Sequence, residues 1–183
     1  LSMYLEQCGQ GGGGGVDIEF AADGSVVLYA SQQDNGQGHL TTLTQIFSDR
    51  LGYDAELIKV VQGDSLRTPP GTTGGAKMAS VLGSSVSEAA SLIAVDAQKL
   101  AAEHLGVDDA DVGLVEGVFT ASGTNQSISI EELVRLTATE DGPHPLNRFN
   151  DYQASGATYP YGSHIIEIEV DKASFVPQIV RYT

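Results

Sequence analysis

One short stretch combines residue types that suit a phosphate-bearing ligand: Gly36, Gln37, Gly38 and His39, with Thr42 close behind. Because glycine has no side chain, a ligand can lie directly on the backbone at this point. The Gln37 amide can both donate to and accept from the edge of a heterocycle. A helix that begins near His39 would present N–H groups and the positive end of its dipole, which favour phosphate. A glycine-rich turn that merely leads into an ordinary helix is the alternative, and the spacing alone leaves it open.

A second segment, SLRTPPGTTGGAKMA at residues 65–79, is also rich in Gly, Thr and Pro and runs into a helix. Two loops that each open a helix could converge on one phosphate-bearing ligand. The candidate contacts here are Gly75, Ala76, Lys77 and Met78. The segment contains no GxxxxGK[ST] pattern, so it is not a P-loop.

The glycine-rich run at residues 9–15 is predicted to be a flexible loop. It contains the letters of GxGxxG, but strand-like sequence follows it and none precedes it, which is the wrong order for a dinucleotide fingerprint. Cys8 is the chain's one cysteine, which excludes a disulfide or a cysteine zinc site within the chain. The four histidines are scattered, so we assign neither a metal ligand nor a catalytic residue.

The acidic composition restricts the possible partners. The chain has 24 acidic and 9 basic residues, a formal net charge of -15, and a hydrophobic fraction of 41%. This charge argues against nucleic acid and against anionic membrane surfaces, both of which need a basic face. We expect a cytoplasmic protein without a membrane-spanning segment or a signal peptide. The chain starts without Met, so we expect a piece of a longer protein.

The alternation of apolar and polar residues predicts a single α/β (α+β) domain over residues 1–183. Strands are expected at 16–20 and 25–31, at 55–64, at 111–123 and in a hairpin from 164 to the end. Helices are expected from about residue 39 to Leu51, from about 80 to 105, and after Ser129, which forms a capping box with Glu132. Residues 140–163 suggest an extended connection. The element order predicts two layers, a mixed sheet with helices packed on one face.

Several motifs, in order, resemble the molybdopterin-binding region of the molybdenum hydroxylase large subunits, the family of xanthine dehydrogenase, aldehyde oxidase and aerobic carbon monoxide dehydrogenase. The segment DGSVVLYASQQDNGQGHLTTLTQIFSDRLG looks like the family's strand followed by GQGxxT, then QI and LG. The segment KVVQGDS is similar to the next strand, and YPYGSHIIEIEVD and IVRYT resemble the closing strands. The similarity covers nearly the whole chain.

This resemblance implies that the GQG loop and the second loop contact a molybdopterin cofactor, as its cytosine dinucleotide form in bacterial members. The implied site comprises Gly36, Gln37, Gly38, His39, Thr42, Gly75, Ala76, Lys77 and Met78. The family hydroxylates an aldehyde or an N-heterocycle, or oxidises carbon monoxide, and passes electrons to Fe-S and FAD partners. The implied partners are therefore the remainder of the large subunit, the Fe-S and FAD subunits or domains, and further copies of the complex.

The sequence departs from the family at two points. The second loop usually reads GSRS, whereas Gly75-Ala76-Lys77-Met78 stands here and lacks both hydroxyls. The GxGE motif that carries the family's general-base glutamate does not occur, so this chain alone is expected to be inactive. A cofactor-free scaffold or subunit-interface domain is therefore the alternative.

Overall fold

The structure is a computed structural model that describes residues 1–9 and 12–183. Its helices are α1 (His39–Leu51), α2 (Gly83–Leu105) and α3 (Ile130–Thr137), with short helical turns at Ala55–Leu57, Met78–Leu82 and Asp109–Asp111. Its strands are β1 (Ser2–Leu5), β2 (Gly13–Phe20), β3 (Val26–Ala30), β4 (Ile58–Gln62), β5 (Val112–Val115), β6 (Val118–Ala121), β7 (Ser127–Ser129), β8 (Arg148–Gln153), β9 (Tyr161–His164), β10 (Ile166–Val170) and β11 (Pro177–Tyr182).

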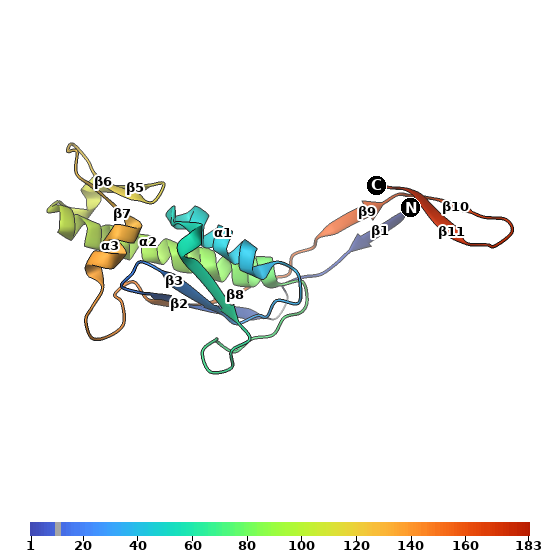
Figure 1. Cartoon of the computed structure of the whole chain (residues 1–183), viewed down its shortest axis with the longest axis horizontal. Coiled ribbons are helices and arrows are strands. Elements are labelled where there is room, and N and C mark those ends of the chain that lie inside the picture. Colours follow the sequence, from blue (N-terminus) through green and yellow to red (C-terminus); the bar gives the residue numbers. More distant parts are fainter. Residues whose placement is uncertain (10–11) are drawn as a thin grey trace.

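The body is built on a mixed sheet in the order β4-β3-β2-β8, with α1 and α2 on one face (Figure 1). β3 and β4 are parallel and are joined through α1, whereas β2 is antiparallel to both β3 and β8. Burial alternates along β2, where Val16, Ile18 and Phe20 are buried, as expected of a sheet with one covered face. The predicted two-layer α/β fold is confirmed.

Helix α2 packs closely on the body through small side chains. Ala89, Ile93, Ala97 and Ala101 are fully buried at helical spacing, and they let the helix approach the core. Within the described residues one helical stretch, Met78–Leu105, is long and apolar enough to span a membrane by length and composition alone, with a mean hydropathy of 1.4. The buried face of α2 accounts for this apolar content.

The glycine-rich run is not a flexible loop over its last three residues. Gly13–Gly15 open strand β2 and pair with β8, with Gly13 opposite Gln153 and Gly15 opposite Asp151. A side chain at Gly14 would come within 3.1 Å of the Leu82 backbone, so glycine lets the segment that leads into α2 pack against the strand. Residues 10–11 of the predicted loop lie outside the described residues.

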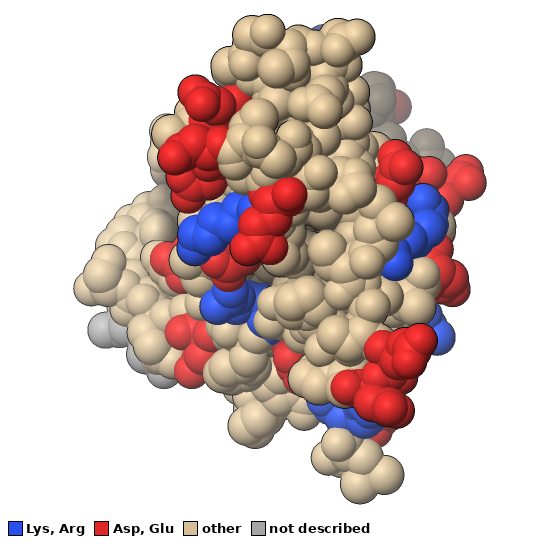
Figure 2. Space-filling view, turned by 90° about the vertical axis from the view of Figure 1, so that its left-hand side faces the viewer, with Lys and Arg blue, Asp and Glu red and all other residues tan. Residues whose placement is uncertain are grey.

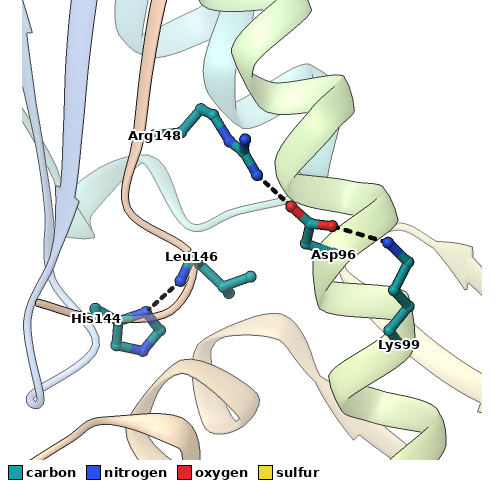
Figure 3. Close-up of polar contacts among 5 residues, drawn as sticks. All are labelled: Asp96, Lys99, His144, Leu146 and Arg148. Carbon is teal, nitrogen blue, oxygen red and sulfur yellow. Dashed lines mark hydrogen bonds and ion pairs between the residues drawn. The ribbon is translucent and has the colours of Figure 1, made fainter.

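The segment predicted as an extended connection, residues 140–163, contains two strands. β8 forms an edge of the main sheet and is tied to α2 by an ion pair between Arg148 and Asp96 (Figure 3). Asp96 also accepts from Lys99 one turn further along α2, at 3.1 Å. The sequence does not predict β8 because its partner, the glycine-rich start of β2, has the composition of a loop.

A small sheet, β5-β6-β7, and α3 lie at one end of the body (Figure 1). The predicted cap is present, since the Ser129 hydroxyl accepts from the Glu132 N–H at 3.1 Å. Figure 2 shows this end of the molecule, where carboxylates outnumber lysine and arginine side chains and the two kinds lie next to each other. This view therefore offers no continuous basic surface of the kind that nucleic acid requires.

Two narrow antiparallel ribbons, β1-β9 and β10-β11, extend away from the opposite end of the body (Figure 1). We call residues 1–5 and 161–183, which form them, the arm. The predicted closing hairpin is confirmed as β10-β11.

Candidate functional site

The two candidate loops follow the carboxyl ends of β3 and β4, which are neighbouring parallel strands, so both loops lie at the same end of the sheet. The first loop follows β3 and leads into α1, and the second follows β4 and leads into α2. In open α/β sheets ligands bind outside the carboxyl ends of the strands. The site predicted from the sequence therefore lies at the carboxyl end of the strands, where ligands bind in this class of sheet.

The first loop has the open backbone that its glycines predict. Gly36 and Gly38 have φ of 101° and 78°, in the left-handed region that favours glycine. A Cβ at either position would meet nothing within 4 Å. Glycine is thus required here by backbone conformation, and the space above the backbone is free for a ligand. Between them the Gln37 side chain is exposed, and its carbonyl accepts from the Asn35 N–H.

The Asp34 side chain accepts hydrogen bonds from backbone N–H groups of this loop. Its carboxylate accepts from the N–H groups of Gly36 at 2.7 Å, Gln37 at 2.9 Å and His39 at 3.2 Å. The hydrogen bond from Gly36, followed by that from Gln37, holds the pKa of Asp34 below its usual value. The expectation of free N–H groups at the start of α1 is therefore corrected, because the chain's own anion already binds the first of them. A phosphate at this helix end would compete with Asp34.

A buried polar cluster, Gln32, His39 and Gln62, lies beneath the first loop. Gln32 and His39 are fully buried, and the Gln62 amide contacts both the Gln32 carbonyl and His39 Nδ1, the latter at 3.1 Å. Both side-chain polar atoms of Gln32, together with His39 Nε2 and Gln62 Oε1, are buried without a hydrogen-bond partner. Each such atom costs about 1–3 kcal/mol when unpaired. These unpaired amide and imidazole atoms give the cluster hydrogen-bonding capacity that the described side chains do not use.

The second loop rests on the first and closes a pocket with it. The Thr73 hydroxyl donates to the Gln33 carbonyl at 2.7 Å, and Gly71 lies so close to Ser31 that a Cβ would come within 2.7 Å of it. A pocket of about 400 Å³ lies where the loops meet. Its lining residues are Gln37, Thr73, Gly74, Ala76, Lys77, Met78 and Ala79.

The structure brings four of the predicted site residues together in this pocket: Gln37, Ala76, Lys77 and Met78. The glycines Gly36, Gly38 and Gly75 shape the two loops and do not line it. His39 points into the buried polar cluster, and the Thr42 hydroxyl donates to the Gly38 carbonyl at 3.0 Å, within α1.

The sequence reasoning missed Gln32, Asp34, Gln62 and Thr73. The Asp-Asn-Gly pattern that precedes GQG was the available signal for Asp34, since Asp side chains commonly bind backbone N–H groups two and three residues on. No local signal marks Gln32 or Gln62, because their neighbourhood arises from the pairing of β3 with β4.

The surroundings of the pocket fit a neutral, hydrogen-bonding heterocycle better than an anion at the start of α1. The Gln37 amide offers a donor and an acceptor in the lining, and four glycines, Gly36, Gly38, Gly74 and Gly75, leave open backbone in the two loops. The buried cluster does not line the pocket. Lys77, whose Nζ lies 3.5 Å from the Thr72 hydroxyl, is the cation in the lining. Among the residues that the structure describes, no group of three His, Cys, Asp or Glu side chains could hold a metal ion.

Comparison with known proteins agrees with this geometry. The family of molybdopterin cofactor-binding domains matches residues 1–183, so the chain belongs to that family, and its resemblance to the molybdenum hydroxylase large subunits is confirmed. Subunit gamma of the 6-hydroxypseudooxynicotine dehydrogenase complex of Paenarthrobacter nicotinovorans is 31% identical over all of this chain and 24% of its own length. The carbon monoxide dehydrogenase large chain of Hydrogenophaga pseudoflava is 28% identical over 91% of this chain and 21% of its own length.

A solved structure extends the similarity to three dimensions. The Cu,Mo-CO dehydrogenase in its carbon monoxide reduced state superposes with a TM-score of 0.88 at 26% identity, over 99% of this chain and 25% of that one. Quinoline 2-oxidoreductase from Pseudomonas putida 86 shares the fold, with a TM-score of 0.81. The chain thus spans about a quarter of the length of these relatives.

Proposed function

We propose that this chain holds the molybdopterin cofactor within the large subunit of an oxidoreductase. The observation that carries the proposal is the meeting of the two loops: Gln37 and Ala76–Met78 line one pocket in a chain that belongs to a molybdopterin-binding family. The bound group would supply the redox chemistry, and the protein would bind and orient it.

Two residues of the pocket lining, the buried cluster and Asp34 each have a role in this proposal. The Gln37 amide would pair with a heterocycle edge, and Lys77 would neutralise a phosphate. Gln32 and Gln62 would supply the hydrogen bonds that they lack within the chain. Asp34 would keep an anionic group away from the start of α1, so the phosphates would lie on the Lys77 side. The cytosine dinucleotide form of the cofactor is part of this proposal.

The names of the relatives suggest the reaction class. They include a carbon monoxide dehydrogenase, a nicotine 6-hydroxylase and a 6-hydroxypseudooxynicotine dehydrogenase. We therefore propose a cytoplasmic enzyme that hydroxylates an aldehyde or an N-heterocycle, or oxidises carbon monoxide. Its electrons would pass to Fe-S and flavin partners, as part of an oligomeric complex with the remainder of the large subunit.

A cofactor-free scaffold is the second candidate, and three observations favour it. Gly75–Met78 offer no hydroxyl, and Ala76 has a left-handed φ of 48°, which is strained for a residue with a Cβ. In addition, the Asp34 carboxylate already accepts hydrogen bonds from the N–H groups of Gly36 and Gln37 in the first loop.

Molybdenum and pterin content decides between the two candidates. The full-length large subunit should contain both, while Gln37→Ala and Gln32→Met should lower both without lowering the midpoint of thermal unfolding. Gln32→Met should even stabilise the cofactor-free protein, because it removes two unpaired buried polar atoms. Gln126→Ala, at an exposed turn, is the matched control. A full-length wild-type subunit without molybdenum would establish the scaffold instead.

A further inference from the structure

The arm carries an amphipathic ribbon whose apolar face has no partner among the described residues. In the β10-β11 register, Ile166 pairs with Tyr182, Ile168 with Ile179 and Val170 with Pro177, so these six side chains share one face. The register shifts between Glu167 and Ile168, which leaves Val180 without a register partner at a bulge. On the other face Glu167 pairs with Arg181 and Glu169 with Gln178, so its paired positions are polar.

The apolar face is exposed to solvent over its whole length. Ile168 is 56% exposed and Ile179 is 66% exposed, and every residue of both strands is exposed. β10-β11 extends beyond β1-β9, away from the body (Figure 1). A lone two-stranded ribbon is at best marginally stable in water, and contiguous exposed apolar surface marks an interaction site. The ribbon therefore has the composition of a docking element.

Both ends of the chain lie in the arm, at adjacent positions. Ser2 pairs with His164 in β1-β9, and Thr183 exchanges backbone hydrogen bonds of 2.8 and 2.9 Å with Ile165. A cluster of three rings lies at this junction: His164 is 5.7 Å from Tyr4 and 5.6 Å from Tyr182 between ring centroids, the latter edge-on, and the Tyr182 hydroxyl is 2.7 Å from His164 Nδ1. In a relative about four times as long, most of the polypeptide lies outside the region that matches this chain, and any polypeptide that continued from residue 1 or from residue 183 would leave from the arm.

We propose that the apolar face of β10-β11 is the surface on which the remainder of the large-subunit polypeptide docks. The inference rests on the proposed function, because it places the chain within a large subunit. The occupant is the large-subunit polypeptide outside this segment, because polypeptide that continues from either end would leave the segment beside the apolar face and would be at high local concentration there. A second copy or another subunit would have no such tether.

Site-specific photo-crosslinking in the full-length large subunit tests this. The photoreactive residue p-benzoylphenylalanine is introduced at Ile168 on the apolar face, and at Gln178 on the polar face of the same ribbon as the matched control. We expect Ile168 to give crosslinks to other regions of the same polypeptide and Gln178 to give few. Crosslinks to a second copy, crosslinks to another subunit, or equal yields at both positions would each overturn the inference.

A second measurement remains informative if the probe disturbs folding. The double variant Ile168→Asn/Ile179→Asn should raise amide hydrogen exchange of residues 166–182 in the full-length subunit, while Glu169→Gln should leave it unchanged. Unchanged exchange in the double variant would overturn the inference. Molybdenum content is determined on the same samples, so that failure of the proposed function is detected separately.

Discussion

At the scale of single residues, His144 is the clearest case of a side chain whose ionisation is coupled to folding. It is buried, its Nε2 lies 3.0 Å from the Val134 carbonyl, and its Nδ1 lies 3.1 Å from the Leu146 nitrogen (Figure 3). An N–H donates at Leu146, so Nδ1 must accept and Nε2 must carry the proton. Burial lowers the pKa of His144 below its usual value of 6.5, and the bond to Val134 opposes that effect only in part.

This arrangement predicts a loss of stability in acid. A histidine with a lowered native pKa binds fewer protons in the native than in the unfolded state, so its contribution is complete above pH 6.5 and is lost as the pH falls through the native pKa. The free energy of unfolding from urea titrations should therefore fall as the pH is lowered from about 6.5 through the native pKa. The fall should be smaller in His144→Gln, whereas His104→Gln, at the exposed end of α2, should keep it. Equal falls in wild type and His144→Gln would contradict the assignment.

The candidate site was predictable where single residues act through their own type. Gly36, Gln37 and Gly38 stand out in the sequence because an amide between two glycines is an unusual combination, and Lys77 stands out as a cation in a glycine-rich loop. Gln32 and Gln62 could not be found in this way. They become neighbours only when β3 pairs with β4 and Ala30 comes to lie opposite Gln62, which is a tertiary event.

At the scale of elements, helices α1 and α2 end in the same way but in different surroundings. Gly52 and Gly106 follow the two helices with φ of 67° and 69°. A Cβ at Gly52 would lie 2.0 Å from the Gly117 nitrogen, whereas one at Gly106 would meet nothing within 4 Å. Gly52 thus lets the end of α1 touch the β5-β6 turn backbone to backbone.

The pair allows backbone strain to be separated from steric exclusion. Gly106→Ala should cost about 1–2 kcal/mol of unfolding free energy, the cost of a left-handed conformation for a residue with a Cβ. Gly52→Ala should cost clearly more, because the β5-β6 turn must also move. Urea unfolding of the two variants at the same pH gives the comparison. Equal losses would show that the turn yields without cost and that the close contact is unimportant for stability.

Elements with a strong local pattern were predictable, and those defined by a distant partner were not. The first hairpin, α1 and the Ser129 cap follow from alternation, helical spacing and capping chemistry, and all are present. β8, by contrast, has the sequence RFNDYQ, and its ladder partner begins 135 residues earlier in three glycines. Glycine has low strand propensity, so only the close packing of Gly14 on Leu82 reveals why a strand starts there.

At the scale of the whole molecule, the body and the arm differ in how much apolar surface they bury. The buried core joins residues of β2, β3, α1, α2 and α3, while no residue of the described arm belongs to it. The stability of the arm within this chain must therefore come mainly from its own ladders and the ring cluster around His164, together with the hydrogen bond between Cys8 and Thr158 at its base, 2.7 Å long. Local stability in proteins follows buried apolar contact, so the arm should open more readily than the body.

Amide hydrogen exchange of this 183-residue chain tests that difference. Amides of β10 and β11 should exchange faster than those of β2 and β3, whose alternate side chains are fully buried. The matched control is the β5-β6 hairpin, which is similarly short but buries Val112 and Phe119 on the body. It should be protected more strongly than β10-β11, because its opening exposes core side chains to water. If the two hairpins exchange at the same rate, hairpin length and not apolar burial determines local stability in this molecule.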